Sequence, residues 1–80
     1  MQHIEKFLNK LSKVERIKVC QVIDNILNGH FISLDIKKLK GIENLYRVRV
    51  GKVRIVYTEI SGKNTIVTVG WRNDTTYRNY

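Results

Sequence analysis

All but one of the arginines in this chain lie after residue 45, and Arg47, Arg49 and Arg54 share one short segment. Residues 46–57 alternate polar and apolar side chains on both sides of a Gly-Lys pair, a pattern that predicts two strands joined by a II′ turn. In that hairpin Arg49 faces Arg54. Opposed like charges are destabilising, and the nearby sequence offers no anion to neutralise them. We therefore expect an external anion, most naturally phosphate, at these guanidinium groups.

The overall charge supports an anionic partner. The formal net charge is +8 and the sequence pI is about 9.9, values that favour binding to a polyanion but say nothing about the fold. Acidic residues are scarce after residue 45, where only Glu59 and Asp74 occur. A basic run at residues 37–41 is more typical of a solvated loop than of a binding site.

Two helices are predicted before this basic half of the chain. Ile4, Phe7, Leu8 and Leu11 have helical spacing, so we expect a first helix over residues 2–10. Ser12-x-x-Glu15 is a capping-box pattern that starts a second helix, which Gly29 should end at the C′ position. The buried side of that helix is expected to consist of its apolar residues, which are Val14, Ile17, Cys20, Val22, Ile23, Ile26 and Leu27.

Three strands are predicted to follow, at residues 45–50, 53–60 and 65–71, with a four-residue turn at 61–64. Residues 30–44 show no long period and are expected to form a loop. The sheet face on the helices should hold Tyr46, Val48, Val50, Val53, Ile55 and Tyr57, joined by Val67, Val69 and Trp71. The opposite face should then carry Arg47, Arg49, Arg54 and Arg72. The predicted fold is α+β, a single domain over residues 1–80 with an N-terminal helical hairpin on a three- to four-stranded antiparallel sheet.

The remaining composition argues against several kinds of protein. Cys20 is the single cysteine, so no internal disulfide forms, and we expect it to fill the core. His3, His30 and Cys20 have no zinc-ligand spacing, so neither a metal nor another cofactor is expected. No apolar run approaches a membrane span and the N-terminus lacks a signal-peptide pattern, which makes a cytoplasmic location the expectation.

Three segments together resemble the core of the RelE/ParE superfamily of bacterial toxin–antitoxin toxins. They are Leu39-Lys40-Gly41, residues 45–57, and Val69-Gly70-Trp71-Arg72-Asn73-Asp74, within a likeness that covers roughly residues 5–77. Members of the RelE branch are ribosome-dependent, metal-independent endoribonucleases that cut mRNA, and a cognate antitoxin wraps and neutralises them. The resemblance implies the same for this chain.

Roles for individual residues follow from the resemblance by position. Arg54 matches the arginine that holds the scissile phosphate, Arg72 matches the catalytic arginine after the last strand, and Tyr77 falls near a tail tyrosine. The implied catalytic residues are Arg54, Arg72, Arg49 and Tyr77, and the implied RNA-binding residues are Arg47, Arg49, Lys52, Arg78 and Tyr80. Because a guanidinium is a poor base, the arginines should orient the 2′-hydroxyl and stabilise charge.

The chain departs from the family pattern in two places. Helical spacing begins at Ile4, where relatives usually have a β-strand, so a sheet edge should be exposed and available to a partner strand. Trp71 precedes Arg72, where many relatives have a polar or basic residue. Two alternatives therefore remain open beside the nuclease: a ParE-like toxin that inhibits DNA gyrase by binding, and a family member that only binds RNA or an antitoxin.

Overall fold

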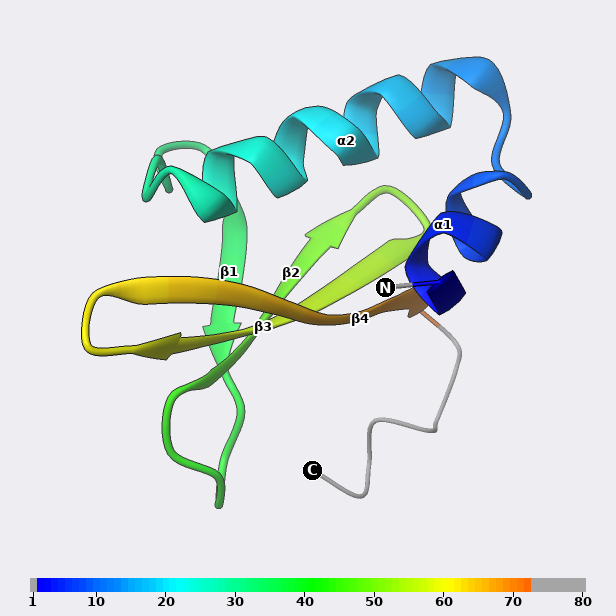
Figure 1. Cartoon of the computed structure of the whole chain (residues 1–80). Helices are drawn as coiled ribbons and strands as arrows, with labels where there is room; N and C mark the ends of the chain where they lie inside the picture. Colours follow the sequence, from blue (N-terminus) through cyan, green and yellow to red (C-terminus); the bar gives the residue numbers. More distant parts are fainter. Residues whose placement is uncertain (1, 73–80) are drawn as a thin grey trace.

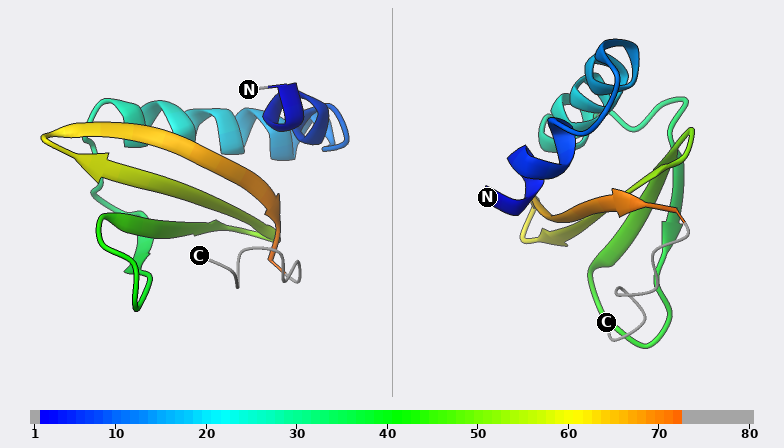
Figure 2. Two further views of the ribbon diagram at one scale, coloured as in Figure 1. Left: turned by 60° about the horizontal axis from the view of Figure 1, so that its bottom comes forward. Right: turned by 90° about the vertical axis from the view of Figure 1, so that its right-hand side faces the viewer.

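The computed structural model describes residues 2–72. Two helices, α1 (Gln2–Leu8) and α2 (Lys13–Leu27), precede four strands, β1 (Asp35–Lys38), β2 (Leu45–Val50), β3 (Val53–Ile60) and β4 (Lys63–Trp71). The strands form one antiparallel sheet in the order β1-β2-β3-β4. Both helices lie over the same face of the sheet (Figure 1), and the turned views in Figure 2 show the two layers. This arrangement confirms the predicted α+β fold.

α1 ends two residues earlier than the apolar spacing predicts. The amide of Lys10 donates to the carbonyl of Phe7 at 3.0 Å, and the amide of Leu11 donates to the carbonyl of Leu8 at 3.2 Å. These bonds span three residues instead of four, so the chain tightens and leaves the helix after Leu8. The tightened turn brings Leu11 into the core, where 6% of it is exposed.

Both ends of α2 form as the sequence predicts. The Ser12 hydroxyl accepts the Glu15 amide at 3.2 Å, and the Glu15 carboxylate accepts the Ser12 amide at 3.1 Å, which completes the capping box. At the other end Gly29 takes a φ of 74°. The amides of Gly29 and His30 donate to the carbonyls of Ile26 and Asn25, the two bonds of a Schellman motif.

The buried face of α2 is narrower than predicted. Val19 and Ile26 are fully buried and Val22 and Ile23 pack partly against the core. The prediction that Cys20 fills the core is wrong, because its side chain is exposed. Val14, Ile17 and Leu27 are also exposed, by 76%, 50% and 48%. Because α2 covers the sheet as a single layer, only one stripe of the helix meets the strands (Figure 2).

β1 lies inside the stretch that was predicted to be a loop. Its four residues pair with β2, with Ile36 opposite Val48 and Asp35 opposite Arg49. A four-residue strand with one apolar side chain leaves too little alternation to detect. β1 therefore adds a fourth strand to the sheet beside β2, and the sheet edge on this side is β1 itself. Within residues 2–72 the outer strands are β1 and β4.

A bulge changes which residues of β4 face the helices. The turn before β4 is Ser61-Gly62, two residues long, and the register then shifts between Val56 and Tyr57. As a result Ile66, opposite Tyr57, joins the buried cluster, and the prediction that Val67 does so is wrong. A bulge adds one residue to one strand, so the alternation of faces breaks at that point.

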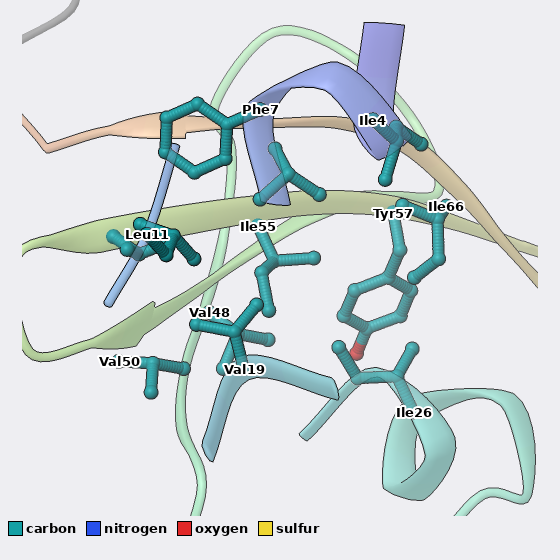
Figure 3. Packing of buried hydrophobic residues seen from close by; sticks show 12 residues of the cluster. Ile4, Phe7, Leu11, Val19, Ile26, Val48, Val50, Ile55, Tyr57 and Ile66 are labelled. Carbon is teal, nitrogen blue, oxygen red and sulfur yellow. The ribbon is translucent and has the colours of Figure 1, made fainter. Parts of the chain in front are cut away.

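The core lies between the helices and the sheet (Figure 3). Tyr57, which is 3% exposed, stacks on Tyr46 at 5.3 Å and on Phe31 at 6.0 Å between ring centroids. Burial raises the pKa of the Tyr57 phenol above its ordinary 10.0, and the nearby Tyr46 and Glu59 raise it further. Among residues 2–72, neither helix has the length and hydrophobicity needed to span a bilayer.

Candidate nucleic-acid interface

The hairpin of β2 and β3 places its arginines as predicted. Arg49 pairs directly with Arg54, one step from the turn. Gly51 has a φ of 58°, the positive value that the first central residue of a II′ turn takes. Arg47 lies on the same side of β2 as Arg49, because side chains two residues apart share a face. The buried cluster occupies the other face, so these arginines lie on the face away from the helices.

An internal carboxylate meets two of these arginines, which corrects the expectation that no anion is nearby. Asp35 on β1 pairs with Arg49 across the strands. Its Oδ2 lies 3.2 Å from Nε of Arg49, and its Oδ1 lies 3.9 Å from Nη1 of Arg47. Sequence reasoning missed this contact because β1 itself was missed. The charge of Arg49 is thus shared between Asp35 and any external anion.

The two arginines that contact Asp35, Arg47 and Arg49, differ in their exposure to solvent. The side chain of Arg47 is 10% exposed, whereas that of Arg49 is 37% exposed and that of Asp35 is 57% exposed. Arg47 therefore adds positive charge to this face of the sheet, although most of its side chain is buried. Arg49 and Asp35 form an exposed ion pair that an incoming anion can reach.

Arg72 is anchored at the turn of the same hairpin, close to the Arg49–Arg54 pair. Its backbone amide donates to the carbonyl of Lys52 at 2.8 Å, and its Nη1 donates to the carbonyl of Gly51 at 3.2 Å. The turn thus holds both the main chain and the side chain of Arg72 beside the start of β3. No sequence pattern predicts this contact, because it joins residues 21 positions apart.

A depression of about 540 Å³ lies at this end of the sheet, where β3 begins and β4 ends. Among residues 2–72 its lining consists of Lys52, Arg54, Trp71 and Arg72, and we refer to the surface that these residues form as the arginine depression. Three of these described residues are cationic and none of them is acidic. The surface can therefore hold an anion with several donors at once. Arg54 lies on β3 and Arg72 directly follows β4, so the two residues meet here only through the fold.

The structure thus divides the predicted site residues into groups. Arg54, Arg72 and Lys52 line the arginine depression, while Arg47 and Arg49 contact Asp35. Tyr77, Arg78 and Tyr80 lie outside the described residues. Trp71 was predicted to face the helices, and it also borders the depression. Among residues 2–72, His, Cys, Asp and Glu side chains form no cluster that could hold a metal ion.

Comparison with known proteins identifies the family. No protein-family model matches the chain. A curated relative, Toxin RelE3 of Methanocaldococcus jannaschii, is 41% identical over 66 residues, which cover 82% of this chain and 69% of the relative. This chain belongs to the RelE toxin family. The resemblance inferred from the sequence is therefore confirmed.

A solved structure supports the assignment to the RelE family. The protein in the crystal structure of the RelB-RelE antitoxin-toxin complex from Methanococcus jannaschii superimposes with a TM-score of 0.77 at 27% sequence identity. The match covers 100% of this chain and 95% of that chain. The RelE-like fold therefore includes the strands of residues 2–72 that border the arginine depression.

Proposed function

We propose that this RelE-family chain is a toxin that cleaves mRNA on the ribosome, without a metal ion. The observation that supports this most directly is the meeting of Arg54, Arg72 and Lys52 around one depression. Three cations converge there, and Arg72 is held in place by the hairpin turn. A fixed set of donors is what a reaction at a phosphate diester requires, because charge develops on the phosphoryl oxygens.

The chemistry that fits these donors is attack by the 2′-hydroxyl on the neighbouring phosphorus. The new O2′–P bond forms as the P–O5′ bond breaks, which leaves a cyclic phosphate and a free 5′-hydroxyl. We propose that Arg54 and Arg72 stabilise the extra charge on the phosphoryl oxygens, and that Lys52 donates to the departing 5′ oxygen. Arg49 would orient the RNA beside them. A guanidinium cannot act as a general base near neutral pH. We therefore propose that Tyr77, as the phenolate, takes the 2′-hydroxyl proton, while Lys52 gives a proton to the 5′ oxygen as the 5′-hydroxyl leaves.

We also propose that a cognate antitoxin binds this chain, as the RelB-RelE complex of the structural relative suggests. The outward side of α2 supports a protein partner, because Val14 and Ile17 are 76% and 50% exposed. Neighbouring exposed apolar side chains are typical of protein contact surfaces. The antitoxin should lose affinity for an Ile17→Asp variant that still cleaves RNA.

The proposed function is tested by measuring translation and mRNA cleavage in a cell-free extract, with and without ribosomes. Arg54→Ala and Arg72→Ala should each slow cleavage by about 10²–10³, the usual cost of removing one donor to a developing oxyanion. Both variants should stay folded and still bind the antitoxin. Lys38→Ala, which removes an exposed cation of β1, is the matched control and should cleave normally.

Three results would contradict the nuclease proposal. Full activity of both arginine variants would show that the depression is not the catalytic site. Growth arrest by the wild type without RNA cleavage, together with inhibited gyrase, would support the ParE-like alternative. RNA binding without cleavage or toxicity would support a family member that only binds.

A further inference from the structure

A second basic depression lies beside the arginine depression, between α1 and the end of β4. Its volume is about 400 Å³, and its lining includes His3, Lys6 and Lys10 together with Phe7 and Trp71. We refer to this surface, defined by those five residues, as the α1 groove. None of the described residues that line it is acidic. The proposed cleavage chemistry makes no use of it.

The cations of the α1 groove share one side of the first helix and its final turn. His3 and Lys6 are three residues apart on α1, which places them on the same face. Lys10 lies in the turn that follows α1 and lines the same groove. Glu5, the only acid in α1, does not line the groove. All three basic side chains are exposed. The groove is therefore an accessible patch of one sign of charge.

Trp71 connects the two depressions, because it lines both of them. It is 40% exposed, and its ring meets Phe7 edge to face, with centroids 5.0 Å apart and planes at 70°. The contact with Phe7 orients the indole and leaves part of it accessible. An accessible aromatic ring between two cationic surfaces is the arrangement that proteins use for single-stranded nucleic acid, with bases on the ring and phosphates at the cations.

We propose that the α1 groove binds the single-stranded RNA that extends from the arginine depression. A base stacks on Trp71 and the adjoining phosphates lie near Lys6 and Lys10. This inference rests on the proposed function, because it takes the strand in the arginine depression to be RNA. An acidic peptide is less well matched, since the exposed apolar surface that would favour a peptide lies on α2. The RNA site is thus longer than the catalytic depression.

Trp71 is the chain's single tryptophan, so the protein's tryptophan fluorescence reports on the place where the α1 groove and the arginine depression adjoin. The probe is RNA of mixed sequence with 2′-O-methyl groups, which cannot be cleaved, as a tetranucleotide and a dodecanucleotide. The dodecanucleotide should quench Trp71 and bind more tightly than the tetranucleotide. Binding is followed by fluorescence and, independently, by anisotropy of labelled RNA.

The deciding comparison uses two double variants that remove the same charge. Lys6→Ala/Lys10→Ala should weaken dodecanucleotide binding about tenfold and lower the slope of log affinity against log salt by about 1.4, since each single-strand phosphate contact contributes about 0.7. Lys13→Ala/Lys18→Ala removes two exposed cations of α2 and should leave both quantities close to wild type. All four substitutions lie on exposed side chains, so all variants should fold.

The inference is overturned if the two double variants bind RNA alike, or if RNA binds by anisotropy without changing Trp71 fluorescence. In both cases RNA cleavage by the wild type would leave the proposed function intact. Conversely, groove-dependent RNA binding by a protein that cleaves nothing in the extract would refute only the nuclease. A third outcome is that a polyglutamate peptide quenches Trp71 fluorescence, that RNA does not, and that the peptide's binding depends on Lys6 and Lys10. This outcome would assign the α1 groove to an acidic protein partner and reject RNA.

Discussion

Asp35 should limit RNA binding on the face that carries the arginines. Its Oδ2 lies 3.2 Å from Nε of Arg49 and its Oδ1 lies 3.9 Å from Nη1 of Arg47. Under the proposed function, Asp35 would therefore compete with an RNA phosphate for these guanidinium groups. Asp35→Asn keeps the shape of the side chain and removes its charge. We expect this change to weaken the fold slightly and strengthen RNA binding, two effects of opposite sign.

The magnitudes follow from the exposure of the pair. Arg49 is 37% exposed and Asp35 is 57% exposed, and ion pairs in such positions typically contribute about 0.2–1 kcal/mol. The free energy of unfolding of Asp35→Asn should therefore fall by no more than about 1 kcal/mol. Removing the competing carboxylate should raise RNA affinity by a similar free energy, which corresponds to a factor of about 1.4 to 5.

The assay measures the affinity of uncleavable RNA at several salt concentrations, with urea unfolding of the same preparations. Freeing Arg49 for one more phosphate should steepen the salt slope by about 0.7. Asp24→Asn, which removes an exposed carboxylate of α2, controls for the change in net charge. If Asp35→Asn binds RNA no more tightly than Asp24→Asn, Asp35 does not compete with phosphate and our reading of the arginine face is wrong.

Three further predictions concern stability. Ile55 is fully buried and Ile60 is 58% exposed, so in urea unfolding Ile55→Ala should cost about 2–5 kcal/mol and Ile60→Ala about 0.5 kcal/mol or less. Gly51→Ala should lower the free energy of unfolding by about 1–2 kcal/mol, because Gly51 has a φ of 58° that strains an L-residue backbone. No atom lies within 4 Å of the added Cβ, so backbone strain is the only penalty. An unchanged midpoint of urea unfolding would contradict this prediction. Burial raises the pKa of Tyr57 above 10.0, so stability should fall as pH rises beyond 10.0, where the unfolded chain loses the proton first, and Tyr57→Phe should show a smaller fall.

The sequence by itself determined the features that depend on neighbours along the chain. The capping box of Ser12 and Glu15 and the end of α2 at Gly29 involve residues within one helical turn. The register that opposes Arg49 and Arg54 follows from a two-residue turn and strict alternation. In each case the interacting groups are a few residues apart, so the order of residue types is enough to specify the contact.

Only the tertiary structure decided which side of α2 is buried and where β4 changes face. The apolar residues of α2 cover more than one side, and packing on a single sheet layer left Ile17 and Cys20 in solvent. Because of the bulge between Val56 and Tyr57, Ile66 lies in the core instead of Val67. Burial depends on what is placed opposite a side chain, and periodicity within one element does not contain that information.

The candidate site shows the same division. The types and positions of Arg54 and Arg72 could be predicted as a phosphate-binding set from the sequence and its family likeness. Their meeting in one depression, the anchoring of Arg72 on the hairpin turn and the contact of Asp35 with Arg49 depend on strands paired across long stretches of chain. Such pairing is settled by the packing of the whole sheet on its helices, because no local hydrogen bond or turn specifies it.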